Sequence, residues 1–312
     1  MRMRRVTVDL SLQSFVSAGA LTHAEGSRAF YEAKQAAGGQ LGPTSYDELL
    51  AARAALPPEP TESRAIEYLA HADTGEVSVR ITRPSSGKSR AAYLDIHGGG
   101  FFMDSAARGD VRNAGVADAL SVTVVSVDYR LAPEHPWPAA PDDCETAALW
   151  LAGEGRELFD TDRFVIRGAS AGATLAATTL LRLRNRGLVN TCAGAVLLFG
   201  AYDLSGLTPG GRLYGDEWFI QSYAGHVDDR SVPDVSPLFG DLRGLPPTLL
   251  VVGARDVLLE DNLAMAARLS AAGVGVDLRV YPEAMHGFTS HPTSMAALAA
   301  REIGEWLAHR LA

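Results

Sequence analysis

Short apolar segments alternate with longer amphipathic ones from about residue 64 to the end of the chain. The short segments predict eight strands, over residues 66–71, 76–82, 91–96, 122–128, 163–167, 193–198, 248–252 and 276–280. The longer segments predict helices over residues 106–120, 142–151, 171–186, 260–272 and 292–311. Apolar strands that alternate with helices are typical of a mostly parallel sheet covered on both faces. We therefore predict an α/β fold.

The first sixty residues have a different pattern, which is helical. Ser45 is a candidate N-cap for a helix over residues 46–56, and Glu48 stands at the capping-box position. Pro57 and Pro58 should end this helix, because proline cannot continue it.

A second departure is the connection of almost fifty residues between strands that end near Phe199 and begin at Thr248. A connection this long in a compact domain is usually functional, such as a lid. We expect it to form a cap with the helical N-terminus; the alternative is a decorative helical excursion. Three of its aromatic side chains either line a pocket or pack the cap onto the core: Trp218, Phe219 and Tyr223. The predicted organisation is an N-terminal cap part over 1–60, core over 61–202, a cap insertion over 203–240 and core again over 241–312.

The chain has 312 residues, with 28 basic and 37 acidic side chains and a formal net charge of −9. This balance argues against nucleic acid or anionic membranes as partners, and no cluster of Lys and Arg overrides it. The segment Met1–Arg5 is basic, but Asp9 and Gln13 interrupt the apolar stretch that follows. No run approaches the roughly 18 apolar residues of a membrane span. We expect a cytoplasmic protein, with Cys144 and Cys192 as buried thiols rather than a disulfide.

The sequence G-x-S-x-G stands between an apolar strand and a helix rich in Ala and Leu, with Ser170 at its centre. A serine at the tip of a sharp strand-to-helix turn projects its hydroxyl outward, and small residues at 168 and 172 let the backbones approach closely. The helix N-terminus behind Ser170 favours a developing anion. We predict that Ser170 is a nucleophile; the alternative is a serine N-cap with incidental glycines.

Three consecutive glycines, Gly98 to Gly100, follow a buried strand in the sequence His97-Gly-Gly-Gly-Phe101. Such a run costs conformational entropy, so we infer a backbone requirement, which an oxyanion hole would supply. The alternatives are a flexible loop and a phosphate-binding loop, but the chain lacks both G-x-G-x-x-G and the P-loop Lys-Ser/Thr here. We interpret His97 as an organiser of the loop.

A serine nucleophile needs a histidine to accept its proton and a carboxylate to fix the histidine tautomer. Downstream of Ser170, Asp256 and His286 each follow the end of a predicted strand, at the sheet edge where open α/β sheets bind ligands. Weaker candidates for the acid are Asp203, which enters the supposed cap, and Glu260 and Asp261, which are ordinary partners of a helix dipole. The histidine that precedes Pro292 reads as the start of the last helix.

These motifs resemble those of the hormone-sensitive-lipase-like carboxylesterases, the bacterial family IV type of the α/β-hydrolase superfamily. The resemblance extends from about Arg64 to the C-terminus, over motifs at 97–101, 128–134, 168–172, 256–258 and 286–288. It implies an α/β-hydrolase fold with a mostly parallel sheet of about eight strands, helices on both faces and a helical cap. The chain departs from the family in Ala169, where an acidic residue is usual, and in Val257, where proline is usual.

The resemblance also implies a role for each site residue. Ser170 would be the nucleophile, His286 the general base and then acid, and Asp256 its orienting partner. The amides of Gly99, Gly100 and Ala171 would form the oxyanion hole, and cap helices would shape the acyl pocket. The stretch from Tyr129 to Pro133 would be structural.

The expected activity is hydrolysis of short- to medium-chain carboxylic esters through an acyl-enzyme. The expected partner is a small-molecule ester, and the chemistry calls for no metal and no organic cofactor. The alternatives are another reaction in the same site, such as amide or formamide hydrolysis or a dehydration, and a non-catalytic ligand-binding protein on the same scaffold. A homo-oligomer is left open.

Overall fold

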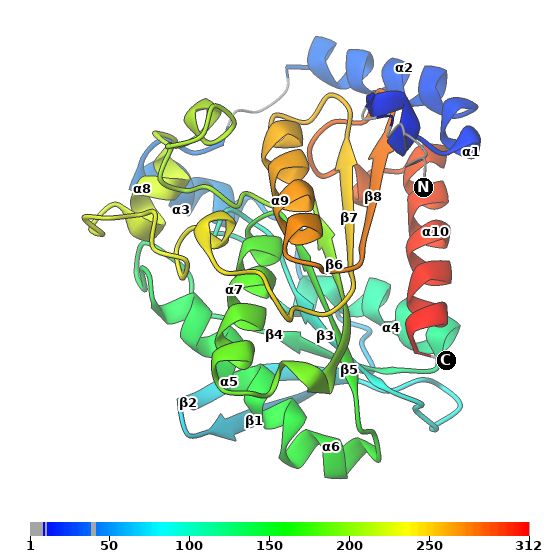
Figure 1. Cartoon of the computed structure of the whole chain (residues 1–312), viewed down its shortest axis with the longest axis vertical. Helices are drawn as coiled ribbons and strands as arrows, with labels where there is room; N and C mark the ends of the chain where they lie inside the picture. The colour runs from blue at the N-terminus through cyan, green and yellow to red at the C-terminus, as the bar shows by residue number, and fades with distance from the viewer. Residues whose placement is uncertain (1–8, 10, 39–41, 312) are drawn as a thin grey trace, which may run out of the picture.

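The computed structural model describes residue 9, residues 11–38 and residues 42–311 (Figure 1). Its centre is one eight-stranded sheet, as expected from the alternation of the sequence. The strands are β1 (Ile66–Ala72), β2 (Gly75–Thr82), β3 (Ala92–Ile96), β4 (Thr123–Val127), β5 (Phe164–Ala169), β6 (Cys192–Leu198), β7 (Thr248–Gly253) and β8 (Val276–Tyr281).

The strands lie in the order β1-β2-β4-β3-β5-β6-β7-β8. Strand β2 is antiparallel to both of its neighbours, β1 and β4. The other neighbouring strands, in the order β4-β3-β5-β6-β7-β8, are all parallel. The carboxyl ends of parallel strands meet at one edge, so the loops that follow β3, β5, β7 and β8 meet there. In the register of β3 and β5, Ile96 pairs with Gly168, which brings the two glycine-containing loops side by side.

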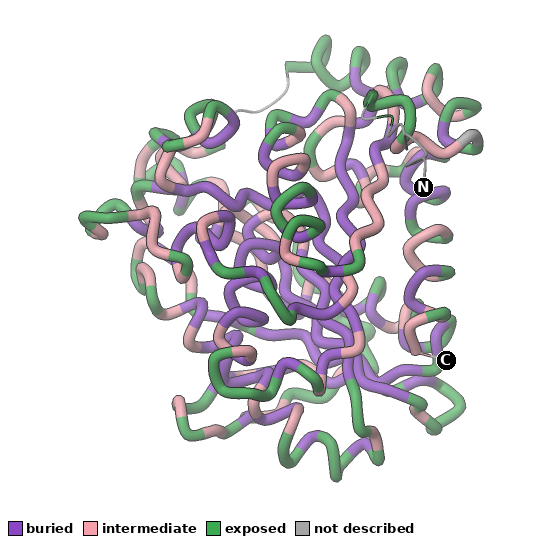
Figure 2. Tube along the Cα trace, in the orientation of Figure 1, coloured by how far each residue is buried: buried purple, intermediate pink, exposed green. Residues whose placement is uncertain are grey.

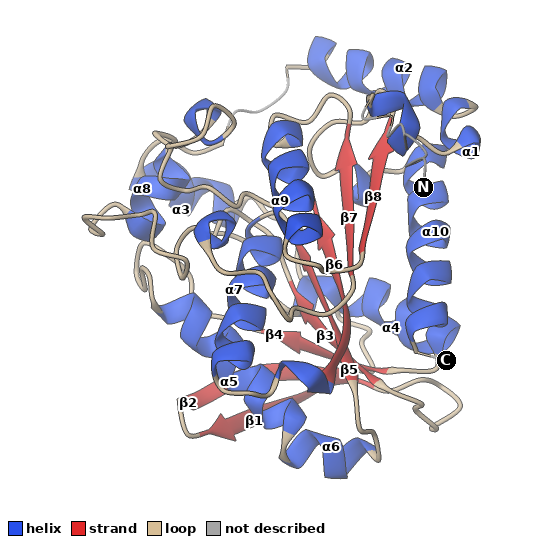
Figure 3. Ribbon diagram, viewed as in Figure 1, coloured by secondary structure: helices blue, strands red, loops and turns tan. Residues whose placement is uncertain are grey.

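Ten α-helices surround the sheet in the described ranges. They are α1 (Ala18–Leu21), α2 (Ala24–Ala36), α3 (Tyr46–Ala54), α4 (Asp110–Leu120), α5 (Ala139–Ala152), α6 (Glu154–Phe159), α7 (Ala171–Asn185), α8 (Trp218–Ala224), α9 (Leu259–Ala271) and α10 (Ser294–Arg310). Helices α5, α7 and α9 cover one face and α4 and α10 the other (Figure 3). Successive strand residues point to opposite faces of the sheet. Leu94 therefore packs on the side of α5, α7 and α9, and Tyr93 packs on the side of α4 and α10. Figure 2 shows the buried sheet between these layers.

The N-terminal residues lie against two different parts of the core. Helix α2 packs against α10, and its Ser27 hydroxyl donates to the carbonyl oxygen of Glu283, in the loop after β8, at 3.1 Å. Helix α3 lies next to the glycine loop, where Arg53 donates to the carbonyl oxygens of Phe102 and Ala132, each at 2.8 Å. Met1 to Val8, part of the predicted N-terminal unit, lies outside the described residues.

The helix that contains Glu48 begins where the sequence predicts it, but its cap differs in one bond. The Ser45 hydroxyl accepts from the Glu48 amide at 3.3 Å, as an N-cap should. The Glu48 carboxylate does not close a capping box on Ser45; it accepts from the amide of Thr44 at 2.7 Å. The helix ends at Ala54, before the two prolines.

Two remaining expectations concern cysteines and membranes. Cys144 and Cys192 are buried free thiols, as predicted. Among the helices in the described part of the chain, none is long and apolar enough to cross a bilayer.

Candidate active site

Ser170 occupies a strained turn between β5 and α7. Its φ of 53° and ψ of −122° are unusual for a residue other than glycine. A Cβ on Gly168 would lie 2.0 Å from the carbonyl oxygen of Gly172, and a Cβ on Gly172 would lie 2.3 Å from the carbonyl oxygens of Ile96 and His97. Both glycines are therefore required by backbone contact, as the sequence motif indicated.

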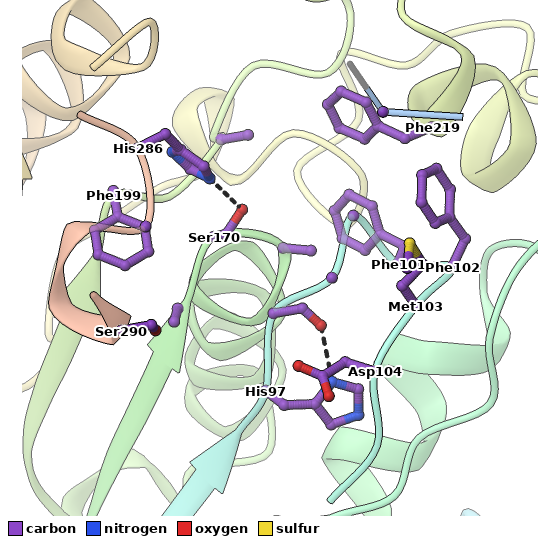
Figure 4. A pocket seen from close by; sticks show the side chains of 18 of the residues that line it. His97, Phe101, Phe102, Met103, Asp104, Ser170, Phe199, Phe219, His286 and Ser290 are labelled. Carbon is purple, nitrogen blue, oxygen red and sulfur yellow. Dashed lines mark hydrogen bonds between the residues drawn. The ribbon is translucent and has the colours of Figure 1, made fainter. Parts of the chain in front are cut away.

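The structure brings Ser170, His286 and Asp256 within hydrogen-bonding reach. The Oγ of Ser170 lies 2.9 Å from Nε2 of His286, the contact drawn in Figure 4. The Nδ1 of His286 lies 3.1 Å from both carboxylate oxygens of Asp256. In the tautomer that satisfies both contacts, Nδ1–H donates to Asp256 and Nε2 accepts from the serine hydroxyl.

The surroundings hold the Asp256 carboxylate and the His286 ring in place. The side chain of Asp256 is fully buried, and its Oδ1 accepts from the amide of Leu258 at 2.9 Å. The β7 and β8 loops meet closely, because a Cβ on Gly253 would lie 2.2 Å from the carbonyl oxygen of Ala284. The ring of Phe199 packs edge-on against the imidazole at 5.1 Å. The 39% exposed His286 side chain therefore has a fixed orientation at the site.

The glycine loop after β3 turns sharply beside Ser170. Gly99 has φ of 102° and Gly100 has φ of 62°, and a Cβ on Gly99 would lie 2.1 Å from the carbonyl oxygen of Met103. Within the described ranges, the amides of Gly99, Gly100 and Ala171 donate to no backbone acceptor. Three unpaired donors next to one serine hydroxyl are what an oxyanion site needs.

His97 organises this loop and lies apart from His286. Its Nδ1 donates to the carbonyl oxygen of Gly98 at 2.8 Å, and its ring stacks on Tyr129 with centroids 4.1 Å apart. The Tyr129 hydroxyl donates to the carbonyl oxygens of His97 and Gly98, both at 3.0 Å. Burial lowers the pKa of the His97 imidazole, which favours its neutral form.

The weaker candidates from the sequence have other partners. The carboxylate of Asp203 accepts from the amides of Ser205 and Thr208, inside its own loop. His291 contacts the hydroxyl of Tyr31 at 3.0 Å and takes no part in the Ser170 cluster.

Asp261, interpreted from the sequence only as an ordinary partner of a helix dipole, lies in the first turn of α9 and has specific hydrogen-bond partners. It is 1% exposed, and its Oδ2 accepts from the Tyr214 hydroxyl at 2.6 Å and from the amides of Tyr202 and Asp203. It therefore anchors the segment after β6 to the helix that follows the Asp256 loop. Burial raises the pKa of Asp261 to about 6, from an ordinary value of 3.8.

This raised pKa predicts a dependence of stability on pH. Between an unfolded-state pKa near 3.8 and a folded-state value of about 6, the folded protein binds more protons, so Asp261 stabilises less as the pH rises. Asp261→Asn removes this titration while keeping an oxygen acceptor. The free energy of unfolding of the variant, relative to wild type, should rise from about pH 4 to about pH 7, as measured by urea unfolding. A difference that does not change with pH would contradict the assignment.

Ser170 and His286 open onto a cavity of about 670 Å³. The glycine loop forms part of its wall, and other lining residues come from the N-terminal segment and the connection after β6: Gly42, Pro43, Leu213, Tyr214, Glu217 and Phe219. The three aromatic residues of that connection have different roles. Phe219 lines the cavity, whereas Tyr223 is 1% exposed and stacks on Phe101 at 3.9 Å, and Trp218 packs against Phe102 at 5.6 Å.

In the described part of the chain, no group of three or more His, Cys, Asp or Glu is arranged to hold a metal ion.

Comparison with known proteins places the chain among hydrolases of one fold. The profile of a family described as having the alpha/beta hydrolase fold matches residues 93–290. Esterase LipI of Mycobacterium tuberculosis is 31% identical over 252 residues, which are 76% of this chain and 79% of LipI. The ethyl acetate hydrolase of Pseudomonas putida is 32% identical over 69% of this chain and 72% of its own length. The match to carboxylic ester hydrolase LipN of Mycobacterium tuberculosis, also 32% identical, spans 61% of that protein.

Solved structures agree with this placement. A hormone-sensitive lipase from a metagenome library superimposes with a TM-score of 0.74 at 30% identity, covering 91% of this chain and 98% of that one. The hyperthermophilic esterase of Pyrobaculum calidifontis gives a TM-score of 0.74 at 28% identity, covering 95% and 97%.

Proposed function

The chain belongs to the α/β-hydrolase family, in its hormone-sensitive-lipase-like group, and on this premise we propose that it hydrolyses carboxylic esters through an acyl-enzyme on Ser170. The observation that supports this most directly is the continuous chain of contacts from Ser170 through His286 to Asp256. The curated relatives named as ester hydrolases support the reaction class.

The proposed reaction begins with attack of the Ser170 hydroxyl on the ester carbonyl. His286 Nε2 takes the serine proton, and Asp256 stabilises the imidazolium through the bond to Nδ1–H. The carbonyl oxygen becomes an anion, which the amides of Gly99 and Gly100 and that of Ala171 would stabilise.

The second half of the reaction reverses these proton transfers. Collapse of the first intermediate breaks the ester bond, and His286 gives its proton to the departing alcohol. Water then attacks the acyl group on Ser170, again losing a proton to His286, and the acid leaves with the serine hydroxyl restored. Every step is a proton or acyl transfer among these residues, substrate and water.

The N-terminal segment and the connection after β6 together serve as the cap in this proposal. Both contribute lining residues, including Pro43 and Phe219, to a cavity whose volume suits a short- to medium-chain ester. The cap boundaries at residues 60, 203 and 240, the cytoplasmic location and the oligomeric state stay predictions.

A matched panel of substrates tests the proposed reaction. The purified chain should hydrolyse 4-nitrophenyl acetate and butyrate with a higher kcat/KM than the corresponding 4-nitroanilides, because the phenolate leaves without needing a proton. Faster cleavage of the anilides would favour the amide hydrolase instead. Turnover of neither series, with no labelling by a fluorophosphonate, would favour the binding protein.

A further inference from the structure

The cavity at Ser170 also reaches a group of arginines that the proposed reaction does not use. Its lining includes Arg108 and Arg112, before and within α4, and Arg167 on β5. Arg167 precedes Ser170 by three residues, so its Cα lies roughly 10 Å back along the strand.

Two of these arginines share one buried carboxylate. Nη2 of Arg112 lies 2.6 Å from Oδ2 of Asp95, and Nη1 of Arg167 lies 2.8 Å from Oδ1. Asp95 is completely buried and also accepts from Asn113 and Ser126. Burial alone would raise the pKa of Asp95, but the two guanidinium groups lower this pKa to about 2. Asp95 therefore stays ionised but neutralises only one of the two cations.

Arg112 lines the cavity, and not all of its guanidinium nitrogens are hydrogen-bonded within the described residues. Its Nη2 and Nε donate to Asp95 and Asn113, while its Nη1 donates to no acceptor in the described ranges. The Arg112 side chain is 45% exposed, and it is part of the cavity wall. Gly109 permits this position, because a Cβ there would lie 2.9 Å from Nη2 of Arg112.

The lining contains three arginines and two carboxylates, and the carboxylate of Glu59 lies 2.5 Å from the hydroxyl of the lining residue Ser105. Arg108 faces Asp104 at 3.6 Å, so three arginines stand against the carboxylates of Asp95 and Asp104. The remaining carboxylate of the lining, Glu217, belongs to the same connection as Phe219. In Figure 4, Phe219 lies near Phe101 and Phe102, and His97 and Asp104 lie further from it.

The side chain of Ala169, next to these arginines, is uncharged and adds no carboxylate to them. Ala169 lines the cavity and lies two residues after Arg167, so both point to the same face of β5.

We propose that this arginine region binds a carboxylate group carried by the ester substrate, and that Arg112 determines the resulting preference for anionic esters. A guanidinium edge matches a carboxylate in charge and in planar geometry. The proposal rests on the proposed ester hydrolysis, since it describes the substrate class of that same site.

Two series of substrates test the proposal on the whole chain. The first compares 4-nitrophenyl monoesters of adipic, pimelic and suberic acids with the neutral 4-nitrophenyl hexanoate, heptanoate and octanoate. The second compares 4-acetoxybenzoate with its neutral methyl ester, so that the carboxylate lies on the alcohol side. Wild type should favour the anionic member by about tenfold or more in kcat/KM in at least one series, a typical value for a charge-assisted contact.

Arg112→Gln should lower the ratio of anionic to neutral kcat/KM by about tenfold, because the free guanidinium edge is lost. Ala169→Asp should lower the same ratio, since it places a carboxylate on the cavity face beside Arg167. The matched control is Arg64→Gln, which removes an arginine paired with Asp118 of α4 outside the cavity lining and should leave the ratio unchanged.

Three results would overturn the proposal: preference for the neutral ester in both series, a preference that survives Arg112→Gln, or an equal loss in Arg64→Gln. Failure of the proposed ester hydrolysis is a separate result, in which neither anionic nor neutral esters of either series are turned over.

Discussion

Ser170→Ala should lower kcat for 4-nitrophenyl butyrate by roughly 10⁴- to 10⁶-fold. The Oγ of Ser170 is the atom that would bond to the acyl group. A water molecule that attacked in its place would not be held beside His286 as the turn holds the serine hydroxyl. The side-chain hydrogen bond lost is the one to His286, so the free energy of unfolding should change little. Activity and urea unfolding of the same preparation measure the two effects separately.

Ser222→Ala is the control for this variant. Ser222 lies on α8, where its hydroxyl donates to the carbonyl oxygen of Trp218 at 2.7 Å, and it does not line the cavity. Its kcat should remain within a few-fold of wild type. A Ser170→Ala enzyme that keeps more than a few per cent of wild-type kcat would exclude the acyl-enzyme on this residue.

Asp256→Asn should lower kcat by about 10⁴-fold without disturbing the fold. The asparagine oxygen can still accept from the amide of Leu258, as Oδ1 of Asp256 does in the wild type. Its amide group, however, donates a hydrogen where the carboxylate accepted one from His286. The imidazole would then carry its proton on Nε2, and that nitrogen could no longer accept the proton of Ser170.

Glu260→Gln serves as the comparison, because Glu260 lies in the first turn of α9, four residues after Asp256. It should keep wild-type activity within a few-fold. If the two variants lose activity equally, or if Asp256→Asn is fully active, Asp256 does not orient His286.

The sheet could be predicted from the sequence because its strands are short, apolar and bounded by turns or helices. All eight predicted strands are present, with ends that differ by at most one residue except in β5, which ends at Ala169 and not at Arg167. The starts of helices were harder. Helix α10 begins at Ser294, since the Thr293 hydroxyl caps it by accepting from Ala296 at 3.1 Å. The short helices α6 and α8 were not predicted, because six or seven residues give too little periodicity.

The Ser170 cluster could be predicted because the parallel sheet places the carboxyl ends of β5, β7 and β8 at one edge. The burial of Asp261 could not, because it depends on how the connection after β6 folds over α9. Phe219 and Tyr223 could not be told apart, since their difference depends on the rotation of a two-turn helix.

The arginine region was missed for a similar reason. Arg112 and Arg167 come from different elements, and only the pairing of β3 with β5 opposes Asp95 to Arg167. The available signal was the presence of Asp95 and Arg167 inside strands that are otherwise apolar. Buried charges in such strands require partners, which Asp95 and Arg167 supply to each other.

Covalent labelling tests the role of Ser170 most directly. A fluorophosphonate ester should inactivate the wild-type protein with one equivalent bound, and peptide mass spectrometry should find the added mass on Ser170. Labelling should become far slower in His286→Ala, because the serine then lacks its base. Complete loss of activity with the label on a different residue, or full activity with Ser170 modified, would contradict the account.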